Sequence, residues 1–199
     1  MKINFSDSFD DSIKTLIRRN TWWYKTYEFF RYDLPRFFKN IWRFRKALWN
    51  HYWYDHHGTL MFLEIGLSHI SDNTEKYGIE VDKSRLKKVE KMRRVVQLIK
   101  NYNEDLYIEM AEKELGEIIM KKPEFKPTEQ NPDFFELVDN ETPEEKEHNL
   151  KVYSRATELE ESEWNELCEI LKGQDYNKFN KETDFDQQFD GSGLRGWWD

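Results

Sequence analysis

Residues 82–99, DKSRLKKVEKMRRVVQLI, form the stretch that most clearly decides the fold. Apolar side chains recur in it at steps of three or four, at Leu86, Val89, Met92, Val96 and Ile99. This spacing is typical of one face of an α-helix, and the basic residues are distributed around the rest of the surface. We therefore predict a long amphipathic helix that begins near Asp82 or Ser84. We expect the pattern to continue to Ile119 with a bend near residues 101–103.

Helices are predicted on both sides of this stretch. Residues 59–77 carry apolar side chains at helical spacing and are followed by Gly78, which favours a helix end. Residues 142–145, TPEE, combine an N-cap residue, a first-turn proline and a glutamate three positions on, which is the signature of a capping box. We expect that helix to run to about Lys172.

The aromatic N-terminal part is also expected to be helical. Apolar residues at helical spacing over residues 13–23 predict a first helix. Pro35 lacks a backbone N–H group and clashes with the preceding turn, so it predicts a break or kink near residues 33–34 with a new helix after it. Gly58 is expected to end this part of the chain.

We therefore predict an all-α protein with an irregular acidic linker and C-terminal segment. Its expected parts are an aromatic and basic helical core (1–120), a proline-containing linker (121–142), a C-terminal helix (143–172) and an acidic irregular tail (173–199). The linker has three prolines and no strand alternation, so we expect it to be only partly extended. The tail ends in two tryptophans, which we expect to dock because burial of a large aromatic side chain is favourable.

Charge is divided unevenly along the chain. The first 103 residues hold twenty Lys and Arg against twelve Asp and Glu, a net charge of +8. The remaining residues hold eleven against twenty-seven, a net charge of −16. Such asymmetry is typical of a basic anion-binding face beside an acidic solvating segment. It fits equally well two halves that attract each other within one fold or between subunits.

Several classes of protein are disfavoured. Cys168 is the only cysteine, which excludes an intramolecular disulfide and a multi-cysteine metal site. There is no run of eighteen apolar residues and no secretory leader, so we expect a cytoplasmic protein without a membrane partner. No glycine-rich phosphate loop or nucleophile elbow is present, and no pair of carboxylates stands out as an acid and a base. We therefore expect no enzymatic activity.

The stretch between Trp22 and Tyr54 holds fifteen aromatic residues in thirty-three positions, interleaved with arginines and lysines. Aromatic rings can stack on bases, and guanidinium groups can donate two parallel hydrogen bonds to a phosphate. The same composition also fits a bulky core with a solvated basic rim. A membrane-surface helix is disfavoured because the rings are expected on several helical faces.

Histidines form the one cluster that resembles a metal or acid/base site. They are His51, His56 and His57 beside Asp55, with His69 further along the chain. Metal sites on a single helix prefer ligands four residues apart with a supporting hydrogen-bonded partner, and this cluster meets only part of that pattern. The Asp-His-His string also occurs in phosphoesterases, but their other aspartate motifs are missing. We therefore expect no metal and no cofactor, and assign the cluster to capping, local hydrogen bonding or ligand contact.

The tract IWRFRKALWNHYWYDHHGTLMFLEIGLSHISDNTEKYGIEVDKSRLKKVEKMRRVVQLIKN, together with the terminal RGWWD, resembles a family of tailed-phage early proteins. These proteins pair a tryptophan-rich entry, a W-Y-D segment, an EKYG helix end and a basic helix. The family is expected to include the anti-CBASS sponges, which bind cyclic nucleotides such as cyclic GMP-AMP without cleaving them. The resemblance covers residues 40–101 and the last five residues.

The resemblance implies a helical homo-oligomer, expected to be a tetramer, in the host cytoplasm, with ligand bound between subunits. Polymeric nucleic acid and membranes are not expected as partners. The candidate ligand-binding residues come from the matched tract and from their physical type: Arg43, Arg45, Trp53, Tyr54, His57, Arg93 and Arg94.

Two other functions stay open at this point. The acidic C-terminal half could bind a basic host protein or act as a nucleic-acid mimic. The histidine cluster could serve a phosphodiesterase, in which case a bound cyclic dinucleotide would be cleaved.

Overall fold

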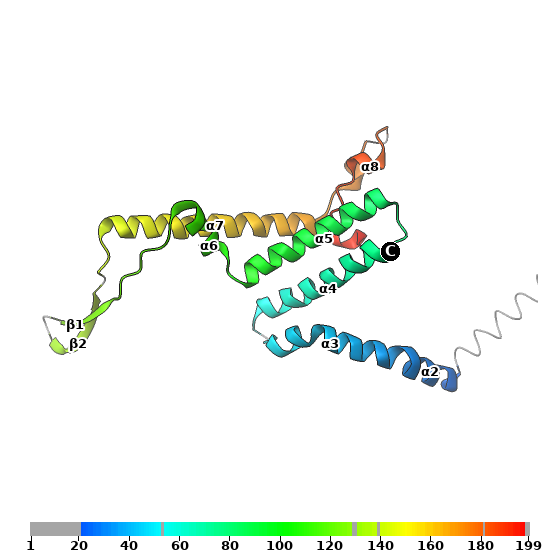
Figure 1. The fold of residues 1–199 in the computed structure, drawn as a ribbon, viewed down its shortest axis with the longest axis horizontal. Helices are drawn as coiled ribbons and strands as arrows, with labels where there is room; N and C mark the ends of the chain where they lie inside the picture. Colours follow the sequence, from blue (N-terminus) through cyan, green and yellow to red (C-terminus); the bar gives the residue numbers. More distant parts are fainter. Residues whose placement is uncertain (1–20, 53, 129–130, 139, 181, 198–199) are drawn as a thin grey trace, which may run out of the picture. The chain divides into compact units, whose positions relative to one another are not determined.

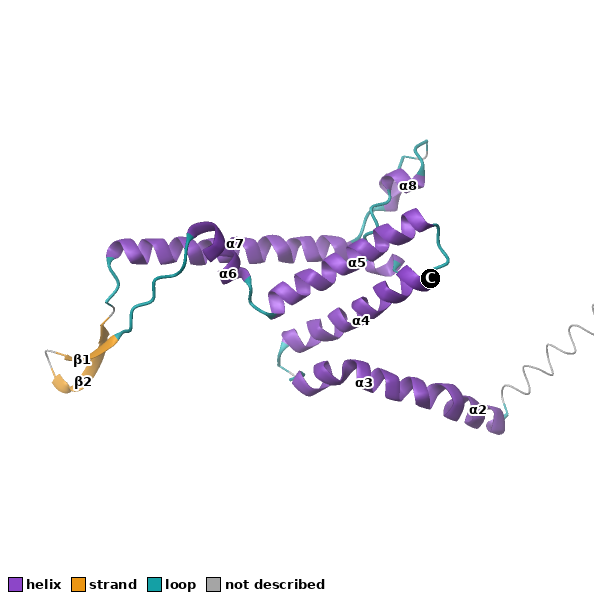
Figure 2. Ribbon diagram, viewed as in Figure 1, coloured by secondary structure: helices purple, strands orange, loops and turns teal. Residues whose placement is uncertain are grey.

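The computed structural model describes residues 21–52, 54–128, 131–138, 140–180 and 182–197, and these residues are mostly helical (Figures 1 and 2). This confirms the helical fold class, with one small two-stranded sheet as the exception. The chain divides into two compact units, residues 1–58 and 59–199. Most of the predicted first helix lies outside the described residues.

The first unit is a run of helix that passes through Pro35. Helix α2 (Trp22–Glu28) leads into the π-helical turn η1 (Phe29–Asp33) and then into α3 (Leu34–Asn50). The predicted break is therefore wrong in form, because the chain widens into a π turn and stays helical. The backbone N–H of Leu34 donates to the carbonyl of Phe29, five residues back, immediately before the proline. Pro35 lies in the first turn of α3, where its missing N–H is tolerated.

In the second unit, α4 (His56–Tyr77) and α5 (Asp82–Asn103) form a helical hairpin joined by a short link (Figure 1). The first three residues of α4, 56–58, belong to the first unit, and the rest of the helix belongs to the second. The predicted start of α5 at Asp82 is confirmed. Its predicted continuation is wrong, since α5 ends at Asn103 and a separate helix, α6 (Tyr107–Leu115), follows. Asp105 between them has a φ of 51°, a left-handed backbone conformation that interrupts a right-handed α-helix.

Helix α7 (Pro143–Lys172) has the predicted bounds and the predicted capping box. The Glu145 N–H donates to Thr142 Oγ1 at 3.3 Å, and the Thr142 N–H donates to Glu145 Oε2 at 2.7 Å. The helix ends at Gly173, which has a φ of 75°.

The prediction of an irregular linker is wrong. Strands β1 (Glu124–Thr128) and β2 (Asn131–Val138) form an antiparallel hairpin in which Phe125 pairs with Leu137 and Pro127 with Phe135. Proline was taken as evidence against a strand, but a two-stranded sheet has only edge strands. A proline can therefore lie with its backbone nitrogen, which has no N–H to donate, facing away from the partner strand.

The core of the second unit is built mainly from α4, α5 and α7. Its buried members are Leu67, Met92, Val95, Val96, Leu98, Ile99, Leu167, Ile170 and Trp197. A second buried cluster joins α6 to α7 through Tyr107, Ala111, Val152 and Ala156. The first cluster fixes α7 against α4 and α5, and the second fixes it against α6.

The C-terminal tail contains the short helices η2 (Tyr176–Lys178), α8 (Phe185–Gln188) and η3 (Leu194–Gly196). Gly191 lies so close to α5 that an added Cβ would come within 2.4 Å of the Lys87 backbone, and its φ is 87°. Trp197 is 5% exposed, and its Nε1–H donates to the Gly191 carbonyl at 2.7 Å. The second terminal tryptophan, Trp198, lies outside the described residues.

Candidate functional site

The rings of the first unit are largely exposed. Those more than half exposed on α2, η1 and α3 include Trp22, Trp23, Tyr27, Phe30, Tyr32, Phe37, Phe38, Trp42 and Trp49. Ala47 is the only buried residue of α3. Within a single chain these rings therefore do not form the bulky core that their composition also allowed. Apolar surface of this extent is typical of interaction sites.

Helix α3 separates its basic and apolar residues strongly. Four basic residues recur at helical spacing on one side: Arg36, Lys39, Arg43 and Lys46. The helix contains no Asp or Glu, and Arg36 reaches back to the Asp33 carboxylate at 2.5 Å. The basic side of α3 therefore carries positive charge that the helix itself does not neutralise.

A groove of about 610 Å³ on α3 brings rings and cations together. Its lining residues are Phe38, Lys39, Trp42 and Arg43. Arg45 flanks the groove, with its guanidinium carbon 4.3 Å from the centre of the Trp42 ring and its Nη1 donating to the Trp42 carbonyl at 2.7 Å. One helix supplies all four lining residues, so the groove is open to solvent. Its volume is in the range of small-molecule sites, about 300–1,000 Å³.

Arg43 and Arg45 are thus the two predicted site residues that the structure places at one groove. Arg43 Nη1 donates to Asn40 Oδ1 at 3.1 Å, an exposed and uncharged contact. Tyr54 is 71% exposed and stacks on Tyr52, with ring centres 5.7 Å apart. Trp53 lies outside the described residues.

His57 lies in the first turn of α4. Its backbone N–H donates to Asp55 Oδ1 at 2.9 Å. This bond is the local capping contact that the sequence suggested for the cluster. The side chains of Asp55, His56 and His57 are the described group of residues that could hold a metal ion.

Arg93 and Arg94 are in ion pairs in the second unit. Arg93 donates to both carboxylate oxygens of Glu75 on α4, at 3.2 and 2.7 Å. Arg94 donates to both oxygens of Glu166 on α7, at 2.7 and 2.5 Å. These hydrogen bonds raise the pKa of each arginine and lower that of each carboxyl group. A phosphate would have to compete with a carboxylate at either residue, so their role in ligand binding stays a prediction.

Sequence reasoning missed Phe38, Lys39 and Trp42 as groove residues. The signal was present, because Phe38 and Trp42, like Lys39 and Arg43, are four residues apart and so adjoin on a helix. These residues were missed because the candidates were taken from the tract of residues 40–101, which begins after Phe38 and Lys39, and Trp42 was not selected from it.

A larger cavity, of about 650 Å³, lies in the second unit. Apolar side chains dominate its lining, among them Ile79, Tyr176 and Phe185. Its one cation, Lys88, is paired with Glu80. That cavity suits an apolar group better than a phosphate.

No protein-family model, curated protein or solved structure matches this chain. Among the described residues, no helix is both long enough and apolar enough to cross a bilayer. The α3 groove offers two flat rings and two cations within six consecutive residues of one helix. Such a set can stack on a planar heterocycle and pair with an anionic group beside it.

Proposed function

We propose that this chain is a non-catalytic binding protein that captures cyclic dinucleotides, such as cyclic GMP-AMP, at the α3 groove. The observation that carries the proposal is the meeting of Phe38 and Trp42 with Lys39 and Arg43 in a helix without carboxylates. The resemblance to phage cyclic-nucleotide sponges supports the same ligand class. A protein of this kind would blunt CBASS defence by withholding the signal.

The chemistry of the ligand matches the groove. A cyclic dinucleotide presents two bases and two phosphates on one small ring. Stacking of a base on an aromatic side chain contributes about 1–3 kcal/mol, and a guanidinium group adds charge-assisted hydrogen bonds to phosphate oxygens. Trp42 and Phe38 supply the ring faces, and Arg43 and Lys39 supply the charge.

The proposal includes association of several copies of the chain. A groove with one helical wall can hold only one side of a cyclic dinucleotide. Symmetry would supply a second set of rings and cations for the second base and phosphate. The exposed apolar side of α3, with Trp42 at 70% and Trp49 at 87% exposure, offers the surface on which copies could associate.

The test is calorimetric titration of the full chain with a panel of cyclic dinucleotides, followed by heating and chromatography of the released ligand. We expect saturable binding and recovery of intact ligand. Replacing both cations, Lys39→Gln with Arg43→Gln, should weaken binding at least tenfold because the phosphates lose their partners. The control is Arg155→Gln. It removes the positive charge of an α7 residue that pairs with Glu114 of α6, and it should leave the affinity for the cyclic dinucleotide unchanged.

Two results would contradict the proposal. One is the absence of binding to any cyclic dinucleotide at micromolar protein. The other is recovery of a linear product, which would point to the phosphodiesterase alternative.

The distribution of side chains on α3 favours a second candidate function, which is binding to the surface of an anionic membrane. The rings were expected on several faces, but the apolar residues of α3 share one broad side: Phe37, Phe38, Ile41, Trp42, Phe44, Leu48 and Trp49. Arg36, Lys39, Arg43 and Lys46 occupy the opposite side, while Arg45 lies over the Trp42 ring on the apolar side. This arrangement is typical of helices that lie in the headgroup region. Co-sedimentation with vesicles tests this candidate. Binding to phosphatidylserine-rich vesicles but not to phosphatidylcholine vesicles would favour it, and absence from both pellets would remove it.

A further inference from the structure

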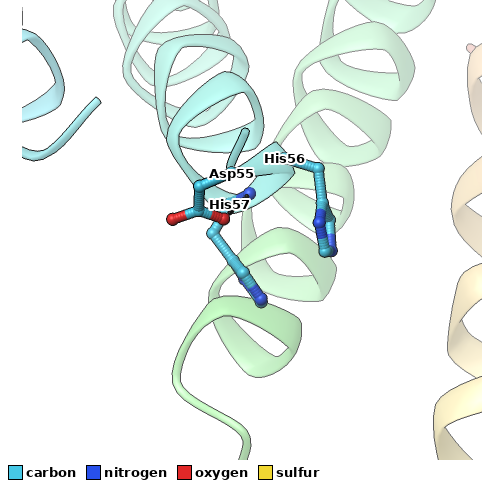
Figure 3. A group of neighbouring side chains, drawn as sticks. All are labelled: Asp55, His56 and His57. Atoms are coloured by element: carbon cyan, nitrogen blue, oxygen red, sulfur yellow. Dashed lines mark hydrogen bonds between the residues drawn. The ribbon is translucent and has the colours of Figure 1, made fainter. Parts of the chain in front are cut away.

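The junction between α3 and α4 gathers three metal-ligating side chains. Asp55 precedes α4, and His56 and His57 form its first two residues (Figure 3). One ligand atom from each residue can be chosen so that all three lie within 4.8 Å of one another. All three belong to the first unit, so this geometry does not depend on how the two units are placed.

The group is held in place by the start of the helix. Asp55 Oδ1 accepts the His57 N–H at 2.9 Å, which positions the carboxylate beside the first turn. The two imidazole rings have their centres 4.3 Å apart and planes inclined by 32°. A carboxylate has a second oxygen and each imidazole has two nitrogens, so one atom from each can turn towards a shared ion.

A third imidazole lies against the same turn. Gly58 has no side chain, and a Cβ added to it would come within 2.8 Å of His51 Nδ1. Glycine at this position therefore lets the His51 ring approach α4 closely. His51 therefore lies against the first turn of α4, beside the group formed by Asp55, His56 and His57.

We propose that Asp55, His56 and His57 bind a divalent transition-metal ion such as Zn²⁺, with His51 against the same helical turn. Imidazole and carboxylate groups are ordinary ligands of such ions, and bonds of about 2.0–2.1 Å in a tetrahedron place ligand atoms about 3.3 Å apart. Rotation of these side chains, which lie at or near the surface, can close the spacing from 4.8 Å. Sequence analysis argued against a metal because it applied the ligand spacing of a single helix. Asp55 instead lies before α4 begins at His56.

Bound metal would tie the residues between α3 and α4 to the first turn of α4. Three protein ligands also leave a tetrahedral ion one position for His51, water or an anion. The inference is independent of the proposed function, because it needs neither a cyclic dinucleotide nor association of copies.

The experiment uses the full chain, purified without a histidine tag and stripped of metal with a chelator. Zn²⁺ affinity is measured by competition with a chromogenic chelator, and Co²⁺ is added separately to record its visible spectrum. We expect one equivalent of Zn²⁺ and a Co²⁺ spectrum typical of low-coordinate nitrogen and oxygen ligation. His57→Ala should lower the affinity at least tenfold, because it removes a ligand.

Two further variants separate a metal site from a folding effect. Asp55→Asn keeps an oxygen that accepts the His57 N–H, so α4 should start normally while metal affinity falls. His148→Ala changes a histidine of α7 that contacts the Glu117 carbonyl, and it should bind Zn²⁺ as the parent does. Equal Zn²⁺ affinity in the parent and the His56→Ala/His57→Ala double variant would overturn the inference. So would the absence of stoichiometric binding in the parent, whose fold is intact.

Discussion

Asn101 is a buried polar residue that holds a carboxylate between two helices. It is 4% exposed on α5, and its Nδ2 donates to both oxygens of Glu163 on α7, at 3.2 and 2.9 Å. Gln97 Nε2 donates to Asn101 Oδ1 at 2.8 Å. Tyr107 lies close to the same carboxylate, and its pKa is raised by burial first and by Glu163 second. The network therefore depends on Asn101 keeping both donor and acceptor contacts.

Replacement of Asn101 by alanine should destabilise the second unit by about 1–3 kcal/mol, because Glu163 loses two hydrogen bonds in a mostly buried position. Urea unfolding followed by far-UV circular dichroism measures the change. Asn73→Ala on α4 is the control, since Asn73 is exposed and its side chain hydrogen-bonds to His69 in its own helix. It should change stability by no more than about 0.5 kcal/mol. Equal effects of the two substitutions would contradict the role given to Asn101.

The ion pair of Arg94 and Glu166 predicts a small loss of stability in acid. The hydrogen bond from Arg94 holds the pKa of Glu166 below its ordinary value of 4.5, so the unfolded chain takes up this proton more readily than the folded one. The stabilisation is complete above that ordinary pKa and disappears as the pH falls through the lower folded value. Both side chains are over a third exposed, which limits the contribution to about 1 kcal/mol or less.

The measurement compares unfolding free energies of the parent and Glu166→Gln between neutral and acidic pH. The two curves should be separated above the ordinary pKa and converge in acid. A separation that persists unchanged at the acid end would show that the pair does not cause it.

At the scale of an element, α7 is set by its first turn. Thr142 caps the helix through the Glu145 N–H, and Lys121 Nζ lies 2.6 Å from Glu145 Oε2. Thr142→Ala should therefore lower the free energy of unfolding by about 0.5–2 kcal/mol. Thr142→Ser keeps the accepting oxygen and should retain most of the stability. Amide hydrogen exchange localises the effect, which should appear as faster exchange in the first turn of α7. Equal exchange in the two variants would remove the capping argument.

Much of the element structure follows from the sequence, because helix starts and ends are local chemical signals. The capping box of α7 and the glycine after it are read directly from residues 142–145 and Gly173. The hairpin was missed because its strands carry prolines, and only knowledge of the pairing shows that both are edge strands. The π turn before Pro35 was missed because widening of a helix has no simple sequence signature.

The candidate site was predictable in type but only partly in position. Composition pointed to rings and cations between Trp22 and Tyr54, and the groove uses Arg43 from that stretch. The contacts of Arg93 and Arg94 could not be foreseen, because Glu75 and Glu166 lie 18 and 72 residues away in sequence. Their pairing depends on how α4, α5 and α7 pack.

At the scale of the whole molecule, the acidic part of the sequence does not act only as a free surface. Glu114, Glu145, Glu147 and Glu166 are each paired with a basic side chain. Lys121, Lys151 and Arg155 lie in the same half of the chain as the carboxylates they pair with, so these three pairs leave its net charge of −16 unchanged. The basic side of α3 carries charge that no carboxylate of that helix neutralises. We therefore keep the proposed anion-binding activity at the N-terminal part of the chain, and the nucleic-acid-mimic alternative stays a prediction.

The central claim is that cyclic dinucleotide binds to associated copies of this chain without being cleaved. Sedimentation velocity with a cyclic dinucleotide, followed at a wavelength where a chromophore on the ligand alone absorbs, tests it most directly. We expect ligand absorbance to move with a species heavier than the 24.5 kDa chain, and the Lys39→Gln/Arg43→Gln variant to leave the ligand behind. Ligand that stays at the meniscus with the parent protein at micromolar concentration, or that moves equally with the variant, would contradict it.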